Sequence, residues 1–271
     1  MRPGGRRIAH LGRPMPEGDA VRRTARRLDE ALAGGALERA DLRVPRFATV
    51  DLRGMRVLGT QVVGKHLLTR LADDRRALTV HTHLRMDGQW RTGPVGPPGA
   101  PAHQIRVWLA TDAQQAVGVR VHMVEVGPTA AESQWVGHLG PDVLAPGFDP
   151  GAAAGRLAEA QRPLVEALLD QRLVSGMGTM WAAELAHEAG VDPRTPTHRV
   201  AGLGEALAVV CARMHRALDA HRGVGRRELA VFERTGQPCR RCGTAIRATR
   251  VGTAPQQRPT YWCPRCQPPL A

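Results

Sequence analysis

The sequence predicts an α+β fold, in which an N-terminal helix and an antiparallel β-sandwich domain are followed by a helical domain and a small cysteine-rich module. Apolar residues recur at helical spacing near the N-terminus, in short alternating runs between residues 40 and 126, and at helical spacing again beyond residue 155. Two close pairs of cysteines lie near the C-terminus. The length of 271 residues with 42% hydrophobic content is enough for packed cores in both parts.

The N-terminal residues divide into a leader and a helix. Residues 1–14 hold four arginines, three glycines and two prolines without periodicity, so we expect an unstructured leader outside the native protein, with translation starting at Met15. Between Asp19 and Leu37 the apolar residues recur at helical spacing. This pattern predicts an amphipathic helix that Asp19 caps and that Gly34 and Gly35 close.

The first domain, residues 15–145, is predicted to be mostly β. Short apolar runs separated by turn residues predict about eight antiparallel strands in a sandwich or flattened barrel. The runs cover residues 42–44, 57–58, 62–63, 67–71, 78–83, 105–109 and 117–126. The Gly/Pro-rich stretch 93–101 is predicted to be a loop, and the stretch 144–155 is predicted to be a linker at a domain boundary.

The helical domain is predicted to span residues 155–235. Its helices are expected at 163–170, 180–189 and 204–221, and a Gly176-Met-Gly178 turn precedes the second of them. Backbone amides at such a helix start can bind a phosphate, and in a basic chain we favour this reading over a plain tight turn.

The charge of the chain indicates a polyanionic partner. Lys and Arg number 38 against 25 Asp and Glu, which gives a net charge of +13 spread over the whole length. Lys65 is the only lysine, which suggests an amine kept because it can lose its proton, with chance survival in an arginine-rich composition as the alternative. Since the chain shows no run of about 18 apolar residues and no secretory signal, we expect a cytoplasmic protein.

The cysteine-rich module, residues 237–268, predicts a structural zinc ribbon. Cys239 and Cys242 form one Cys-x-x-Cys pair, and Cys263 and Cys266 form a second pair after 20 intervening residues. Four thiolates complete a tetrahedral shell, so one Zn²⁺ would stabilise a hairpin and would not catalyse. Redox-active or unpaired thiols are the alternative.

Other site patterns are weak or missing. His81 and His83 share one face of a predicted strand, but no further ligands occur at supporting spacing, so we favour packing or hydrogen bonding over a second metal site. The sequence has no Gly-x-Ser-x-Gly, Walker or dinucleotide-binding pattern, which removes the usual hydrolase, ATPase and dehydrogenase functions.

An ordered set of motifs resembles the formamidopyrimidine-DNA glycosylase / endonuclease VIII family. The set consists of Met15-Pro-Glu-Gly-Asp19, Gly64-Lys-His-Leu-Leu68, Leu169-Asp-Gln with Gly176-x-Gly178, and the terminal zinc ribbon. The Pro-Glu-Gly-Asp opening and the end Arg258-Pro-Thr-Tyr-Trp-Cys263 look more like the actinobacterial endonuclease VIII branch. The resemblance extends from Met15 to about Gln267 and implies a helix-two-turn-helix architecture for the helical domain.

The resemblance implies catalytic roles for four residues. Once methionine is removed, Pro16 would offer a secondary amine that attacks the sugar C1′ and forms a Schiff base, with Glu17 as general acid and base. Lys65 would assist base departure and contact a phosphate. Arg258 of the zinc finger would grip the phosphates beside the flipped nucleotide.

The resemblance also implies DNA contacts. Met86 would fill the hole left by the extruded base, with ordinary core packing as the alternative. Gly178 and Thr179 would bind a phosphate, and since the family usually has Asn at the position of Thr179, lower affinity is expected. An Arg and an aromatic residue of a later loop, which fill the same hole in some family members, have no evident counterpart in the sequence.

We therefore expect a bifunctional DNA glycosylase and apurinic/apyrimidinic lyase of base-excision repair, acting as a monomer on damaged DNA in the bacterial nucleoid, with neither a nucleotide cofactor nor a membrane partner. It would remove oxidised bases, pyrimidines by the branch resemblance, and nick the strand by β,δ-elimination. The alternative is a non-catalytic zinc-ribbon DNA-binding protein derived from the same family, which an intact leader would favour. An RNA-binding or ribosome-associated zinc-ribbon factor fits the charge but leaves Pro16 and Lys65 unexplained.

Overall fold

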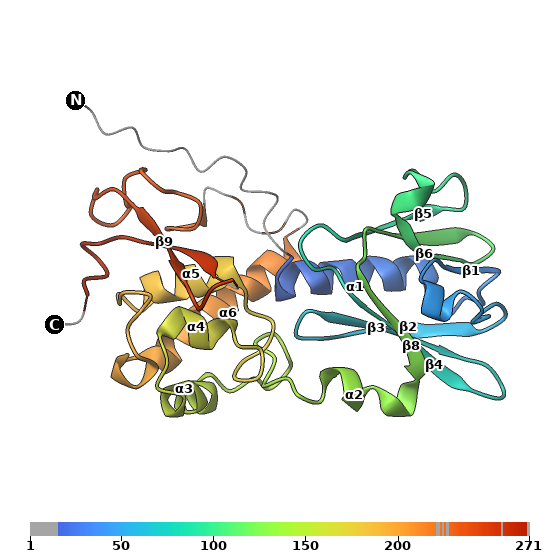
Figure 1. The fold of residues 1–271 in the computed structure, drawn as a ribbon, viewed down its shortest axis with the longest axis horizontal. Coiled ribbons are helices and arrows are strands. Elements are labelled where there is room, and N and C mark those ends of the chain that lie inside the picture. The colour runs from blue at the N-terminus through green and yellow to red at the C-terminus, as the bar shows by residue number, and fades with distance from the viewer. Residues whose placement is uncertain (1–15, 221–222, 224, 226–227, 256, 270–271) are drawn as a thin grey trace.

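The protein has a β-sandwich at one end and a group of helices with a small two-stranded sheet at the other (Figure 1). This computed structural model describes residues 16–220, 223, 225, 228–255 and 257–269. Helix α1 (Gly18–Leu32) runs from the helical end into the sandwich and packs against both of its sheets and against α6 (Leu203–Asp219). The predicted α+β fold class is confirmed, whereas the predicted leader and start at Met15 lie outside the described residues.

The sandwich consists of two four-stranded antiparallel sheets, with strand orders β2-β3-β4-β8 and β1-β6-β7-β5. Its core contains apolar side chains from α1 and from both sheets. The strands are β1 (Arg39–Leu42), β2 (Arg56–Val63), β3 (His66–Ala72), β4 (Ala77–His83), β5 (Gln89–Pro94), β6 (Ile105–Ala110), β7 (Gln114–Val119) and β8 (Met123–Pro128).

Three details of the sandwich differ from the prediction. The runs 57–58 and 62–63 belong to one strand, β2, in which a register shift between Val57 and Gly59 interrupts the alternation of apolar residues. The run 117–126 is divided between β7 and β8. Strand β5 extends to Pro94 and so takes in the first residues of the predicted loop 93–101, because its pairing with β7 tolerates glycine and proline at this sheet edge.

The N-terminal helix is shorter than predicted, and its start is different. It begins after Glu17, and Asp19 lies in its first turn and is not the capping residue. It ends at Leu32, because the amide of Ala33 closes the last turn and Gly34 adopts a left-handed φ of +81°. Leu37 is therefore outside the helix, although its side chain is buried in the sandwich core.

The helical part has a core of its own, centred on the fully buried Trp181. Its elements are α3 (Pro150–Glu159), α4 (Leu164–Leu169), α5 (Thr179–Glu188), α6, β9 (Arg247–Val251) and β10 (Arg258–Trp262). The short helix α2 (Ser133–Val136) follows β8 and stacks its Trp135 on His81 of β4 in the sandwich. Short 3₁₀ turns occur at Pro45–Phe47, Ala102–Gln104, Thr129–Ala131 and Thr197–Arg199. No helix in the described part of the chain is long and apolar enough to cross a membrane.

The predicted linker 144–155 is wrong in its second half, which forms the start of α3. The Asp149 carboxylate accepts hydrogen bonds from the amides of Gly151 and Ala152, and Pro150 occupies the first helical turn. An Asp-Pro pair is a helix-start signal, so this helix was detectable in the sequence despite its glycines. The domain limits themselves stay a prediction.

Candidate active site and zinc site

Glu17 is held in a cradle of backbone amides from the other end of the molecule. Its buried carboxylate accepts hydrogen bonds from the amides of Gly178 at 2.9 Å, Met180 at 2.6 Å and Trp181 at 3.3 Å, all at the start of α5. A side chain at Gly178 would place its Cβ 2.6 Å from the Glu17 Cδ, so only glycine permits this approach. The cradle joins residues 161 positions apart in the sequence.

Lys65 lies in a two-residue turn between β2 and β3. Val63 pairs with His66, and Gly64 adopts a φ of +59°, a conformation that glycine takes without strain. The turn presses against the segment before α5, since a Cβ on Gly64 would lie 3.1 Å from the Ser175 Cβ. This packing brings Lys65 to the junction between the two parts of the molecule.

The charge of Lys65 influences Glu17, and the charges of Glu17 and Arg258 influence Lys65. Burial raises the pKa of the Glu17 carboxyl to about 7, and the Lys65 ammonium is the largest influence against that rise. Burial also lowers the pKa of Lys65; the Glu17 carboxyl opposes the change, and the Arg258 guanidinium adds to it. An acid with a raised pKa beside an amine with a lowered pKa can exchange protons near neutral pH.

Asp142 ties together the segments that carry these residues. Its Oδ2 accepts hydrogen bonds from the Gly64 amide at 2.8 Å and from Arg22 of α1 at 2.7 Å, and its Oδ1 accepts from the Leu144 amide at 2.9 Å. The Gly18 amide, at the start of α1, donates to the Gly176 carbonyl at 2.8 Å. The helix of Glu17, the turn of Lys65 and the approach to α5 are thus joined at one point.

Pro16 and Met86 line the same open cavity. Met86 follows β4 and is 54% exposed, so it is not an ordinary core residue. Arg120, which lies beyond β7, lines this cavity as well, and it adopts a φ of +53°. Asp87 follows Met86 in the chain. Its Oδ1 lies 3.0 Å from His122 Nε2, and its Oδ2 lies 3.8 Å from Arg120 Nε.

The predicted phosphate contact at the start of α5 requires correction at Gly178, whereas the contact of Thr179 stays a prediction. The Gly178 amide, together with those of Met180 and Trp181, donates to Glu17, so the carboxylate occupies the position expected for a phosphate. Thr179 is buried, with only 7% of its surface exposed. A helix start binds any anion that reaches it, and an internal carboxylate does so here.

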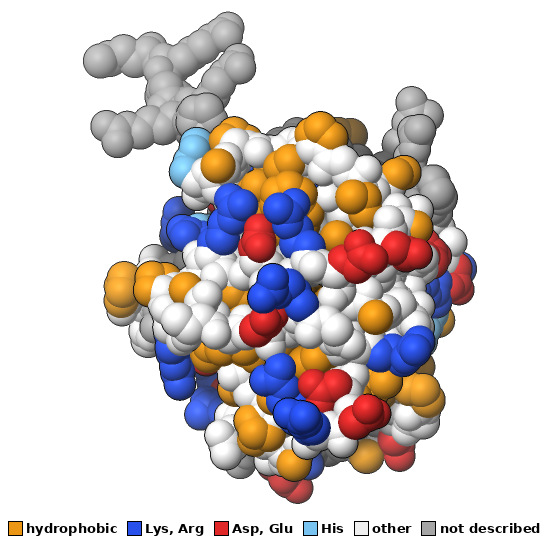
Figure 2. Space-filling view, turned by 90° about the vertical axis from the view of Figure 1, so that its right-hand side faces the viewer, with side chains coloured by type: hydrophobic (Ala, Val, Ile, Leu, Met, Phe, Trp, Pro, Cys, Tyr) orange, Lys and Arg blue, Asp and Glu red, His pale blue; other side chains and the backbone are white. Residues whose placement is uncertain are grey.

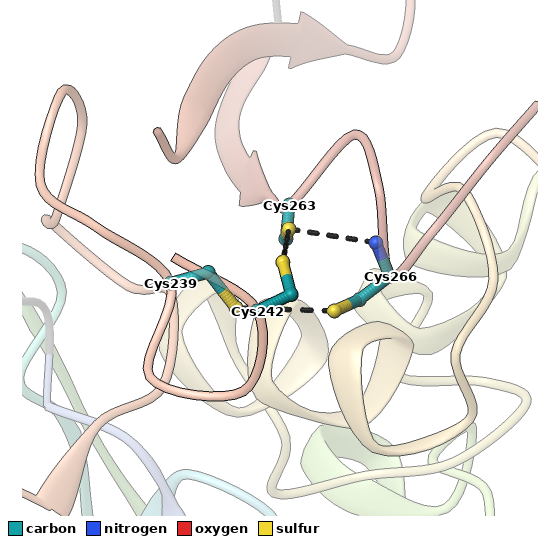
Figure 3. A group of neighbouring side chains, drawn as sticks. All are labelled: Cys239, Cys242, Cys263 and Cys266. Carbon is teal, nitrogen blue, oxygen red and sulfur yellow. Dashed lines mark hydrogen bonds between the residues drawn. The ribbon is translucent and has the colours of Figure 1, made fainter. Parts of the chain in front are cut away.

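The predicted zinc ligands converge (Figure 3). The four cysteine sulfur atoms all lie within 4.8 Å of one another, with 3.4 Å between Cys242 and Cys263 and 3.9 Å between Cys239 and Cys266. Sulfur atoms around a tetrahedral zinc ion with bonds of about 2.3 Å lie about 3.8 Å apart, so the four thiolates fit Zn²⁺.

Histidines lie beside the zinc-site cysteines and within the sandwich. His187 of α5 places its Nε2 3.8 Å from the Cys239 sulfur, so its ring can hydrogen-bond to this zinc ligand. His81 stacks between His66 and Trp135, and His83 accepts a hydrogen bond from the Arg85 amide at 2.9 Å. The interpretation of His81 and His83 as packed and hydrogen-bonded residues is confirmed.

Positive charge is concentrated at the finger and not at the far end of the sandwich. Residues 237–268 carry six arginines and no acidic residue. On the sandwich end, Figure 2 shows basic and acidic side chains side by side, and pairs such as Arg53–Asp51 and Arg46–Glu125 occur in that domain. The finger is therefore the segment to which an anionic polymer is most strongly attracted.

The site combines predicted residues with others that the sequence did not reveal. The charges of Lys65 and Glu17, and those of Arg258 and Lys65, influence one another, whereas Pro16 and Arg258 line different cavities; the catalytic roles of these residues stay a prediction. The cradle amides, Asp142 and His187 were missed, since each acts through a contact with a distant segment and no local pattern marks it.

Comparisons with known proteins identify the family of the chain. The formamidopyrimidine-DNA glycosylase N-terminal domain model matches residues 15–122, the H2TH domain model of the same enzyme matches 139–226, and a zinc finger model found in FPG and IleRS matches 236–269. The fold is similar to that of Lactococcus lactis Fpg in complex with DNA containing an abasic site, with a TM-score of 0.80 and 22% identity over 93% of this chain and 99% of that chain.

Curated relatives match nearly the whole chain. "Probable endonuclease 8 2" of Streptomyces coelicolor is 47% identical over 268 residues, which cover 93% of this chain and 94% of that protein. A DNA-(apurinic or apyrimidinic site) lyase of Mycolicibacterium smegmatis is 41% identical over 264 residues, which cover 93% of this chain and 99% of that protein. The chain therefore belongs to the formamidopyrimidine-DNA glycosylase / endonuclease VIII family of DNA glycosylases and apurinic/apyrimidinic lyases.

Proposed function

We propose that the protein removes oxidised bases, pyrimidines in particular, through a Schiff base on Pro16 and then nicks the strand by β,δ-elimination. The observation that carries the proposal is the buried Glu17 carboxyl directly after Pro16, held by three backbone amides, with its pKa raised to about 7 by burial and lowered in part by the charge of Lys65, the only lysine of the chain. The preference for pyrimidines rests on the likeness to endonuclease 8 proteins.

The chemistry needs a free amine at Pro16. The amine nitrogen attacks C1′ of the damaged nucleotide, the bond from C1′ to the base breaks, and the base leaves with its electron pair and takes up a proton. Glu17, in its protonated form, gives a proton to the ring oxygen as the sugar opens and the iminium forms. Loss of a C2′ proton then expels the 3′ phosphate, and a second elimination expels the 5′ phosphate.

Lys65 and the finger bind and orient the DNA in this proposal. Lys65 supports departure of the base and faces a phosphate, and Arg258 grips the phosphates beside the flipped nucleotide. Met86 enters the space that the extruded base leaves, since it is exposed and lines the cavity of Pro16. Arg120, at the same cavity, is our candidate for the arginine that joins it there.

One structural zinc ion on the four cysteines supports the finger. It supplies folding free energy, because a closed shell of thiolates has no open position for substrate. Every catalytic step above is performed by side chains and by the terminal amine.

Trapping with borohydride tests the proposal. Reduction converts the iminium into a stable adduct between protein and DNA. We would prepare one form that begins at Pro16 and one form blocked at Met1, and expose both to duplex DNA with an oxidised pyrimidine. An adduct is expected only with the first form.

Each other outcome has a definite meaning. Equal trapping by the blocked form would assign the nucleophile to another amine, with Lys65 as the next candidate. An absence of adduct and of strand cleavage with both forms would favour the non-catalytic DNA-binding protein.

A further inference from the structure

Asp19 is buried in the first turn of α1, two residues after Glu17, and only 2% of its surface is exposed. Its Oδ1 accepts a hydrogen bond from the indole Nε1 of Trp181 at 3.1 Å, and its Oδ2 accepts from Arg23 at 3.0 Å. Arg23 also donates to the Ala217 carbonyl of α6 at 2.6 Å. One carboxylate thus connects α1 with α5 directly and with α6 through Arg23.

Trp181 contacts both acidic residues. Its indole nitrogen donates to Asp19, and its backbone amide donates to Glu17 at 3.3 Å. The side chain is fully buried, and the Arg213 guanidinium lies 5.7 Å from the ring centre, so the indole is a fixed point of the helical core. The start of α1 is therefore bound to Trp181 twice, through Glu17 and through Asp19.

We propose that Asp19 is a positioning residue for Glu17: its bond to Trp181 holds the first turn of α1 against α5, so that the Glu17 carboxyl stays in its cradle of amides. The proposal rests on the function proposed above, in which Glu17 exchanges protons with the opened sugar. A carboxylate that acts through a second side chain controls the geometry on which proton transfer depends.

The charge of Asp19 also affects the pKa of Glu17. The negative Asp19 carboxylate adds to the rise in the pKa of Glu17, after burial as the main cause. Lys65 of the β2–β3 turn acts on Glu17 in the opposite sense, and Arg258 of β10 acts on Lys65. Arg23 pairs with Asp19, and Arg22 pairs with Asp142 at the junction. Removal of the Asp19 charge leaves the cations in place and should lower the pKa of Glu17.

Two substitutions separate position from charge. Asp19→Asn keeps an oxygen that can accept from the indole but removes the charge, whereas Trp181→Phe keeps the charge but removes the indole N–H. Asp192→Asn is the matched control, because Asp192 is also buried, at 3% exposure, and pairs with Arg194 away from the site. All variants are tested as zinc-loaded protein in the form that gives the adduct.

The first measurement is the single-turnover rate of borohydride-trapped adduct on DNA with an abasic site, as a function of pH. The wild type should lose rate as pH rises through the pKa of Glu17. In Asp19→Asn, this fall in rate should occur at a pH lower by on the order of half a unit. In Trp181→Phe, the rate should fall at the same pH as in the wild type, but the maximal rate should be about ten-fold lower, with little change in KM. Asp192→Asn should follow the wild type.

The second measurement is the free energy of unfolding at pH 5 and pH 8, which needs no activity. The wild type should lose more stability over this range than Asp19→Asn, because its Glu17 holds its proton to higher pH. A Trp181→Phe variant whose maximal rate matches that of Asp192→Asn would overturn the positioning role, and an Asp19→Asn variant that matches Asp192→Asn in both measurements would overturn the charge effect. A wild type that forms no adduct would instead overturn the proposed function, and the unfolding comparison would still test the effect of the Asp19 charge on Glu17.

Discussion

At the residue scale, the site contains two buried ionisable groups, Glu17 and Lys65, whose pKa values are shifted in opposite directions. Glu17 and Lys65 are both removed from water, so burial favours the neutral form of each. The three cradle amides hold the Glu17 oxygens in place, and Asp142 holds the turn of Lys65 through the Gly64 amide. This arrangement supports the proposed role of Glu17 as a proton donor.

The raised pKa of Glu17 predicts a pH dependence of stability. The folded value of about 7 exceeds the ordinary value of 4.5, so the contribution of Glu17 is complete below pH 4.5 and is lost as pH rises through 7. The loss amounts to roughly 3 kcal/mol, since one pKa unit corresponds to about 1.4 kcal/mol. Glu17→Gln should therefore lose much less stability than the wild type between pH 5 and pH 8, as measured by urea unfolding.

The same variant has a second, functional readout. Glu17→Gln should bind DNA but give no base removal, because the amide cannot supply the proton. Parallel unfolding curves for wild type and Glu17→Gln at both pH values would show that Glu17 carries no raised pKa.

At the scale of single elements, the finger hairpin presents Arg258 to the junction. Arg258 begins β10 and pairs with Val251 at the end of β9. The Glu166 carboxylate of α4 accepts a hydrogen bond from the Gly252 amide at 3.0 Å, which fastens the hairpin tip to the helical part. The pairing of the hairpin and its contact with Glu166 therefore fix the position of Arg258.

Arg258→Ala should weaken DNA binding while the protein stays folded. The lost contact is to phosphate, so affinity should fall for damaged and undamaged DNA alike, and the slope of log K against log salt should decrease by about one. Fluorescence anisotropy over a range of salt concentrations measures both quantities. Arg46→Ala, in an exposed pair with Glu125 on the sandwich, is the control and should leave the slope unchanged.

The zinc finger should unfold when one ligand is removed. Cys239→Ser should lose its zinc and its DNA binding, because a closed site of four cysteines stabilises the hairpin that carries Arg258. Elemental analysis and a binding assay measure the two effects. Cys211→Ser is the matched control: Cys211 is buried in α6, burial raises the pKa of its thiol to about 12, and it should keep its zinc. Full DNA affinity in a zinc-free Cys239→Ser protein would refute the structural role of the ion.

At the scale of the whole molecule, α1 joins the two parts through ion pairs of unequal burial. Arg22 pairs with Asp142, whose side chain is 7% exposed, whereas Arg26 pairs with Asp219, whose side chain is 71% exposed. The first pair lies at the junction of the catalytic segments, and the second lies in solvent. Their contributions to stability should therefore differ.

Asp142→Ala should destabilise the protein by about 3 kcal/mol, because it leaves Arg22 and the Gly64 amide without their buried acceptor. Asp219→Ala, which breaks the exposed pair, should cost less than about 1 kcal/mol. Thermal or urea unfolding measures the difference, and the trapping rate should fall only with Asp142→Ala. Equal effects of the two substitutions would show that the junction does not depend on Asp142.

The sequence by itself determined most of the local structure, the family and the candidates for the reacting groups. Period-two and period-3.6 patterns predicted the sandwich strands and the helices at 163–170, 180–189 and 204–221, since each pattern depends on neighbours within a few residues. Cysteine spacing predicted the zinc ligands for the same reason. Family motifs pointed to Pro16, Glu17, Lys65 and Arg258. Errors occurred where a bulge or an Asp-Pro start broke the simple period, as in β2 and α3.

Only the tertiary structure decided how these groups are held. Asp19 has the appearance of a helix cap in the sequence, yet its carboxylate binds Trp181, 162 residues away. The amides predicted to bind a phosphate receive Glu17 instead, across 161 residues. Such contacts form when two separately cored parts dock, so they depend on the relative position of whole domains and leave no periodic trace in the chain. The proton affinity of Glu17 was beyond the sequence for the same reason, because it depends on how completely the docked domains exclude water.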